Sequence, residues 1–352
     1  MLARPLDQDR LKTELLGHVF DDTAASYKFF WFLAILDLLP NADGSMLRFD
    51  ELFVEMAALA WTPVVRFRLS FGLHDKLQDA IAKVQQAHPK LDAGAPPGEI
   101  RKVMALHARD FAFLREMVPT RFLSPFLWKP KGLRTSALTR FIVDAARDSQ
   151  NEVQRTPYSF DAAGDRIVFG ADWRSFLYHN RLALRDFAER NLIRFLESRN
   201  PSAPSISQKL RLPTERDLAR AKAFWTMADA RAREVHRPLR NIYTADRLPD
   251  SFAIDHFIPW SFVVHDQLWN LVPTDRSSNS AKSDRLPRVE ALLPEFAALH
   301  HFGIHAAGAK PQLLEDYLLC FRVQLPELLA MPEEALTMRL HDALQPLATR
   351  RR

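Results

Sequence analysis

The chain has 352 residues, of which 47% are apolar and 26% are charged, and its net charge at pH 7 is +5. These proportions are typical of a soluble globular protein, and at ~100–200 residues per domain the length suits two or three domains. The single cysteine, Cys320, excludes an intrachain disulfide and so a secreted scaffold held by disulfides. The longest apolar run, residues 29–36, is shorter than the ~20 residues of a membrane span. The opening MLARPLDQDR lacks the apolar core of a signal peptide, so we expect a cytoplasmic protein with no membrane partner.

The first third of the chain predicts helices. Apolar residues recur every three or four positions from Leu11 and become nearly continuous over 27–36, which is typical of a buried helix. Helical periodicity resumes over 45–92 and, after a loop rich in Pro and Gly, continues to about Met117. A basic stretch that contains prolines follows over 119–134.

The middle of the chain predicts a short β-hairpin and then a boundary. Two β-prone runs flank a loop that contains Gly164, which indicates a hairpin near 156–170. Helical periodicity returns over 173–198, and the Pro- and Ser-rich loop that follows marks a boundary between domains. We therefore expect a mostly helical N-terminal region over 1–200 and a second region over 205–352.

Basic residues cluster in two segments. Residues 101–140 contain nine Lys and Arg against two acidic residues, and residues 205–240 contain nine against four. Clustered positive charge suits a polyanion, because each phosphate contact releases condensed counterions. Lys129, Lys131 and Arg134 are therefore candidate contacts to nucleic-acid phosphates. The alternative is a solvated basic loop that binds nothing.

The segment 240–287 breaks the helical pattern and is dense in polar residues. Asp255 and His256 are adjacent on one predicted strand, and Asn270 opens a second short apolar run. Neighbouring side chains on a strand point to opposite faces, so Asp255 and His256 share a site only if a kink redirects one of them. After residue 287 we expect two or three more helices, over 288–352.

A helix is predicted after the second strand, and it carries Asn279 and Lys282 on one face. A hairpin followed by this helix would gather those two residues with Asp255 and His256 in one pocket. Carboxylate and amide oxygens suit Mg²⁺ or Mn²⁺, and a neutral histidine beside them suits a general base. A lysine there can neutralise a phosphate. The set predicts metal-assisted phosphodiester hydrolysis.

This pattern resembles an HNH endonuclease motif, and its spacing is similar, without a gap, to the HNH nuclease module of RNA-guided CRISPR effectors. The resemblance is limited to about residues 240–287. The residues that carry it are Asp255, His256, Asn270, Asn279 and Lys282, together with Pro259, Ser261, Phe262, Asp266, Ser283 and Asp284.

The resemblance implies a ββα-metal fold with one divalent cation, Mg²⁺ or Mn²⁺, held by Asp255 and Asn279. It implies His256 as the general base, Asn270 as the residue that holds the hairpin loop in shape, and Lys282 as a phosphate or structural contact. The products would carry a 5′-phosphate and a 3′-hydroxyl. Many HNH modules also bind a structural zinc through two cysteine pairs. This chain lacks those pairs, so we expect no structural zinc and a module held by packing.

The predicted fold is mainly α with a small α+β part: a helical N-terminal region, then a ββα-metal module flanked by C-terminal helices. The predicted function is a metal-dependent endonuclease that acts on DNA, by analogy in prokaryotic defence against phage or plasmids. The N-terminal region would serve as a sensor, a protein-docking surface or a DNA clamp. Two alternatives stay open. One is a non-catalytic nucleic-acid-binding protein or complex subunit with an inactive HNH fold, and the other is an HNH-type RNase.

Overall fold

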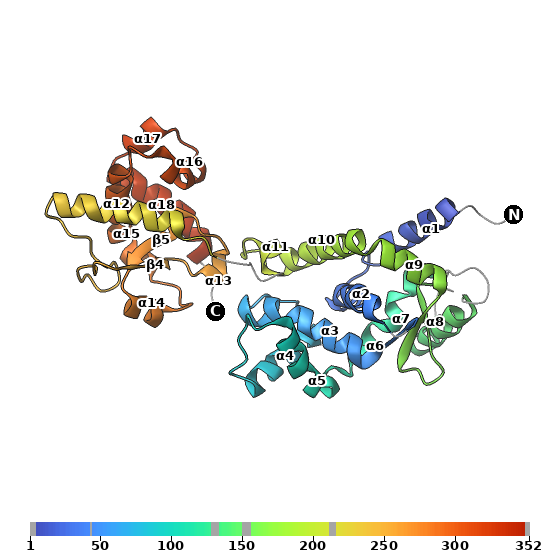
Figure 1. The fold of residues 1–352 in the computed structure, drawn as a ribbon. Coiled ribbons are helices and arrows are strands. Elements are labelled where there is room, and N and C mark those ends of the chain that lie inside the picture. The colour runs from blue at the N-terminus through green and yellow to red at the C-terminus, as the bar shows by residue number, and fades with distance from the viewer. Residues whose placement is uncertain (1–4, 43, 128–133, 150–155, 211–215, 349–352) are drawn as a thin grey trace. The chain divides into compact units, whose positions relative to one another are not determined.

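The computed structural model describes residues 5–42, 44–127, 134–149, 156–210 and 216–348 (Figure 1). The chain divides into two compact units, Met1–Pro201 and Ser202–Arg352. The described residues are mainly helical and form two small antiparallel sheets, which confirms the predicted fold class. Within these residues, no helix has both the length and the apolar character that crossing a membrane requires.

The first unit contains helices and one three-stranded sheet. Its longer helices are α1 (Pro5–Gly17), α2 (Tyr27–Leu38), α3 (Phe49–Trp61), α4 (Lys76–Ala87), α5 (Pro97–Leu106), α8 (Thr135–Ser149), α9 (Ala171–His179) and α10 (Arg181–Arg199). Its short helical segments are η1 (Leu39–Asn41), η2 (Thr62–Arg66), η3 (Ala108–Phe111), α6 (Leu114–Met117), α7 (Pro119–Phe122) and η4 (Ser124–Phe126). Its strands are β1 (Met46–Arg48), β2 (Tyr158–Phe160) and β3 (Arg166–Phe169).

Helix α2 is the centre of this unit, as its apolar sequence predicted. Every residue from Phe29 to Leu36 is buried, and the helix packs against α3 and α10 (Figure 1). The indole of Trp31 donates a hydrogen bond to the hydroxyl of Tyr158 on β2, 2.9 Å away, and that hydroxyl donates to the carbonyl of Pro119. These buried polar groups therefore satisfy one another and join α2 to the sheet.

The sheet of the first unit contains one strand more than the predicted hairpin. Strands β2 and β3 pair antiparallel at the predicted hairpin, and β1 adds to the other side of β3, with Leu47 opposite Ile167. Residues 46–48 lie in a stretch that we had assigned to helix. The strand has only three residues and one buried side chain, so it carries too little periodicity to be recognised.

The second unit surrounds a two-stranded hairpin with helices. Its helices are α11 (Ile206–Lys209), α12 (Ala219–Glu234), α13 (Trp260–Val263), α14 (Arg276–Lys282), α15 (Val289–Ala306), α16 (Glu315–Phe321), α17 (Leu325–Leu329) and α18 (Glu333–Ala348), with the short segments η5 (Leu268–Asn270) and η6 (Pro311–Leu313). Its strands are β4 (Ala253–His256) and β5 (Leu271–Thr274). They pair antiparallel, with Asp255 opposite Val272.

Helices α12 and α15 pack closely against each other and against the hairpin. The indole of Trp225 on α12 donates to the carbonyl of Leu271 on β5, at 3.0 Å. Phe257, directly after β4, packs on Phe296 of α15 with ring centroids 4.3 Å apart. A Cβ at Gly303 would lie 2.7 Å from the Phe224 ring, so only glycine allows this approach of the two helices. This packing holds the hairpin in place.

Candidate active site

A polar cavity of about 300 Å³ lies beside the β4–β5 hairpin. Both Asp255 and His256 line it, although neighbouring strand residues normally point to opposite faces. Strand β4 ends at His256 and the chain bends at Phe257, so the regular alternation stops at this residue. The structure therefore brings Asp255 and His256 to one cavity, which the sequence allowed only if the strand ends or kinks at this point.

The Asp255 carboxylate is buried, with 6% of the residue exposed, and two side chains contact it. The Tyr243 hydroxyl donates to Oδ2 at 2.6 Å, and the Lys282 ammonium lies 3.1 Å from the same oxygen. Burial and the charge of Asp255 raise the pKa of Tyr243, so the phenol keeps its proton and remains a donor. Lys282 also donates to the carbonyl of His256 at 2.6 Å, which ties α14 to the end of β4.

His256 is held in one orientation by a carboxylate. Its Nε2 lies 2.8 Å from Oδ1 of Asp266, and the second oxygen of Asp266 accepts the backbone N–H of Asp217. Because a carboxylate only accepts hydrogen bonds, Nε2 carries the proton and Nδ1 keeps its lone pair. Burial lowers the pKa of His256, and the contact with Asp266 partly opposes this effect. The imidazole is therefore neutral at pH 7.

Asn270 is fully buried where the chain enters β5. Its side-chain oxygen accepts from the backbone N–H of Ile258 at 2.8 Å, and its side-chain nitrogen donates to the carbonyl of the same residue at 2.9 Å. The amide thus replaces a pair of backbone hydrogen bonds across the loop that joins the two strands.

Asn279 lies on α14 and lines the same cavity as Asp255 and His256. Its side chain is half-buried and makes no hydrogen bond with any residue that the structure describes. The helix begins at an N-cap, Asp275, whose side chain accepts the N–H of Ser278 at 2.8 Å. The cap fixes the start of α14 and so the direction in which Asn279 points.

Residues 241–288 match the family model described as HNH endonuclease. The chain therefore contains an HNH-family segment. The match spans the hairpin, the helix α14 and every residue that lines the cavity except Arg216, and it confirms the family resemblance that the sequence motif predicted. No curated protein and no solved structure matches the chain. The HNH match indicates a nuclease of the HNH type.

The donor atoms in the HNH cavity fit one hard divalent cation. Among the described residues, Oδ1 of Asp255 has only a long contact, 3.4 Å, to the Lys282 ammonium, and the Asn279 amide has no partner. No group of three or more His, Cys, Asp or Glu side chains gathers at a metal-binding distance in the described part of the chain. Mg²⁺ commonly takes one or two protein oxygens and completes its shell with water and substrate phosphate, which is the environment that this pair offers.

A hydrogen-bonded cluster of side chains ties the start of the HNH segment to α14. The buried Asn241 amide nitrogen lies 2.6 Å from Oδ2 of Asp275, 3.0 Å from the hydroxyl of Ser278 and 3.2 Å from that of Thr274. Hydroxyls and the N–H of Ser278 lower the pKa of Asp275, so the carboxylate stays ionised as the centre of the cluster. The sequence predicts a module held by packing, and this polar cluster adds hydrogen bonds to that support.

We predict that Asn241→Ala lowers the free energy of unfolding by ~1–3 kcal/mol, because the change removes a buried amide that donates to Asp275 and accepts the N–H of Tyr243. Urea denaturation of the full chain measures it. Asn279→Ala is the matched control: it removes the same amide from a side chain without a partner among the described residues, and should cost less than ~0.5 kcal/mol. Equal losses in the two variants would show that the cluster does not support the module.

Two residues of the site were given no role by the sequence. Arg216 lines the cavity but precedes the motif, and its guanidinium lies over the Trp260 ring, 5.0 Å from the centroid. Tyr243 contacts Asp255 from the other end of the HNH segment. Neither residue type nor spacing marked them. Of the candidate phosphate contacts, Lys129 and Lys131 lie outside the described residues, and Arg134 is exposed at the start of α8.

Proposed function

We propose that the protein is a metal-dependent HNH endonuclease that hydrolyses phosphodiester bonds in DNA. The observation that carries this proposal is the convergence of Asp255, His256 and Asn279 on one polar cavity within the HNH segment. A buried carboxylate, an amide without a partner among the described residues and a neutral, oriented histidine are the groups that this reaction uses.

His256 is the general base of the proposed reaction. Its Nδ1 takes a proton from the attacking water, while Asp266 keeps the ring in the tautomer that leaves Nδ1 unprotonated and stabilises the imidazolium that forms. Asp255 and Asn279 would hold one Mg²⁺ or Mn²⁺. When bound, the cation acts as a Lewis acid on the phosphate and on the departing 3′ oxygen. The products carry a 5′-phosphate and a 3′-hydroxyl.

Three further side chains have supporting roles in this proposal. Asn270 holds the loop between the strands through Ile258. Lys282 orients Asp255 and the end of β4, so we assign it a structural rather than a phosphate contact. Arg216, at the cavity and stacked on Trp260, contacts a phosphate of the substrate.

DNA is proposed as the substrate over RNA, which shares the same site chemistry. A cleavage assay with three substrates of one sequence distinguishes DNA from RNA. The substrates are duplex DNA, single-stranded DNA and RNA, each labelled at the 5′ end. Faster cleavage of a DNA form supports the proposal, and faster cleavage of RNA identifies an HNH-type RNase. A folded protein that binds the nucleic acids and cuts none with any divalent cation has an inactive HNH fold. We place the activity, by analogy, in cytoplasmic defence against phage or plasmids, with the N-terminal region as a regulatory or partner-binding part.

Most of the DNA affinity is expected from residues outside the HNH segment. Residues 240–287 carry five basic and six acidic side chains, a net charge of −1, so the rest of the chain carries +6 and the whole chain +5. Reversal of Lys129, Lys131 and Arg134 to Glu should weaken binding and reduce the slope of log K against log salt, by ~0.9 for each phosphate of duplex DNA that is no longer neutralised. Titration of labelled duplex at several salt concentrations measures the affinity and the slope.

The matched control reverses three arginines that are already paired with carboxylates on helix surfaces. These are Arg10, Arg147 and Arg190, which lie beside Glu14, Asp144 and Asp186 and outside both basic segments. The control changes the net charge equally, so a reduced slope in the first variant alone assigns the phosphate contacts to the basic stretch. Equal effects in both variants, or an unchanged slope in the first, would contradict the assignment.

A further inference from the structure

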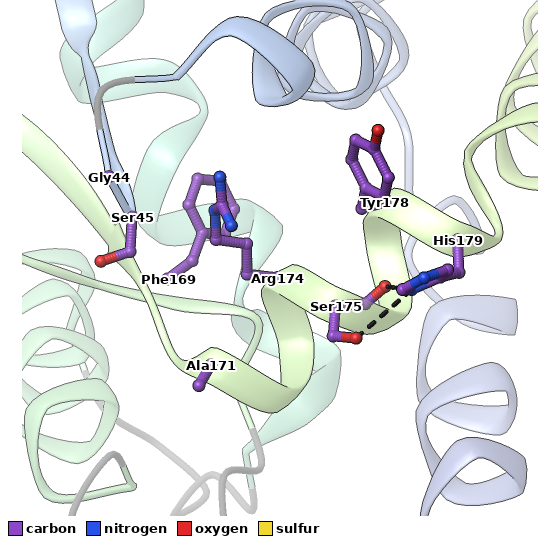
Figure 2. Close-up of a pocket in the computed structure, with 8 residues that line it drawn as sticks. All are labelled: Gly44, Ser45, Phe169, Ala171, Arg174, Ser175, Tyr178 and His179. Carbon is purple, nitrogen blue, oxygen red and sulfur yellow. Dashed lines mark hydrogen bonds between the residues drawn. The ribbon is translucent and has the colours of Figure 1, made fainter.

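A second cavity lies in the first unit, remote in sequence from the HNH segment. Its volume is about 440 Å³, which is in the range of small-molecule sites. Helix α9 forms one wall, and Ser45 before β1 and Phe169 at the end of β3 form another (Figure 2). Every residue that lines the cavity belongs to this unit, and none of them is acidic.

Arg174 gives this cavity a positive charge that nothing in the described structure neutralises. Its guanidinium makes no hydrogen bond or ion pair with any described residue, and its Nε is buried. The nearest acidic residue on α9, Asp172, is two positions away, and residues at that spacing do not face each other on a helix. The Nη groups of the guanidinium are not buried and have no partner among the described residues, so they are the donors that an anion in the cavity can reach.

A second side chain of α9 that lines the cavity, Tyr178, is aromatic. Tyr178 follows Arg174 by one helical turn, and the two side chains project from the same side of α9 (Figure 2). The Tyr178 residue is 52% exposed, so its ring is accessible to a ligand in the cavity. The two positions are about 6 Å apart along the helix axis, so their side chains can contact different parts of one ligand.

The adjoining side of α9 presents a fixed imidazole. Nδ1 of His179 donates to the carbonyl of Ser175 at 2.8 Å, which holds the ring against α9 (Figure 2). The Ser175 hydroxyl lies 3.3 Å from the same Nδ1 and also lines the cavity. Hydroxyl and imidazole groups at the wall add hydrogen-bonding capacity for a polar ligand.

We propose that this cavity binds a nucleotide, with its phosphate on the Arg174 guanidinium and its base stacked on the Tyr178 ring. The planar fork of an arginine matches phosphate geometry, and an exposed aromatic ring stacks on any base. The nucleotide is either free in solution or one unit of a single strand, and the two sources present the same groups. The site does not depend on the nuclease activity, because no residue of the HNH segment takes part.

Calorimetric titration of the full chain in EDTA tests the proposal without cleavage. Adenosine 5′-monophosphate should bind saturably, and adenosine at least about 10-fold more weakly, because it lacks the charged partner of Arg174. Arg174→Met keeps the apolar stem of the side chain and should weaken binding of the monophosphate at least about 10-fold. Arg174→Lys should recover part of that loss, and Arg190→Met, an exposed change on α10, should have no effect.

Two variants of Tyr178 test whether the base stacks on its ring. Tyr178→Phe should retain affinity, and Tyr178→Ala should lose about 5-fold or more. A single-stranded oligodeoxyadenylate of six nucleotides distinguishes a free nucleotide from one unit of a strand. Binding that is tighter than that of the monophosphate, and still sensitive to Arg174→Met, indicates a strand. Weaker binding indicates a free nucleotide. The proposal is overturned if neither ligand binds at millimolar concentration, if adenosine binds as well as its monophosphate, or if folded Arg174→Met binds like wild type.

Discussion

Replacement of His256 by alanine is expected to lower the rate of DNA cleavage by ~10²–10⁴, because a positioned general base contributes a factor of this size. The buried ring contacts Asp266, and the proposed phosphate contacts lie outside the HNH segment in the sequence, so the affinity for DNA should stay within about twofold. Single-turnover cleavage of a plasmid with Mg²⁺ measures the rate, and a binding titration in EDTA measures the affinity.

His265→Ala is the matched control for this substitution. Burial lowers the pKa of His265 to about 4, so this residue is also a neutral imidazole, and it stacks near Trp269 with ring centroids 5.3 Å apart. It does not line the HNH cavity. We expect cleavage by this variant to change by less than about threefold. Wild-type cleavage by the His256 variant, or equal losses in both, would contradict the assignment of the base.

Asp266→Asn is expected to lower the maximal rate by about 10²-fold, with little change in the concentration of DNA that gives half the maximal rate. The amide still offers an oxygen to the N–H of Asp217, so the fold is kept. The asparagine side chain no longer requires a proton on Nε2 of His256, because an amide can donate a hydrogen bond as well as accept one. The rate falls because the base loses both its fixed tautomer and the charge that stabilises its protonated form.

Two measurements distinguish this positioning role from a structural one. The thermal unfolding midpoint of Asp266→Asn should match that of the wild type, because the backbone contact remains. Asp266→Glu keeps the carboxylate and should recover part of the maximal rate, although its longer side chain shifts the contact. An Asn variant that cleaves normally, or a rate loss that merely follows a loss of folded protein, would remove Asp266 from the mechanism.

The HNH segment was predictable because its chemistry is local in sequence. The strand with Asp255 and His256, the second strand after Asn270 and the helix with Asn279 were all expected, and the structure contains them as β4, β5 and α14. Short runs of typed residues at fixed spacing determine these elements. Whether Asp255 and His256 face one cavity depends on where β4 ends, and residue types alone do not fix that point.

Contacts between distant segments were not predictable. Tyr243 reaches Asp255, and Arg216 reaches the cavity from before α12, yet neither follows a spacing that a helix or strand imposes. The cavity with Arg174 depends on the added strand β1, which brings Ser45 beside α9 from more than a hundred residues away. Such sites require the tertiary arrangement, because local periodicity carries no information about them.

The most direct test of the proposed nuclease is cleavage of supercoiled plasmid by the purified full chain, with Mg²⁺ or Mn²⁺, with Zn²⁺, and with EDTA. We predict nicked and then linear DNA with Mg²⁺ or Mn²⁺, no gain with Zn²⁺, and no product with EDTA until Mg²⁺ is restored in excess. Oxygen donors such as Asp255 and Asn279 favour hard cations, which gives this order. Cleavage that continues in EDTA, or a folded protein that binds the plasmid and leaves it intact with every cation, would contradict the proposed function.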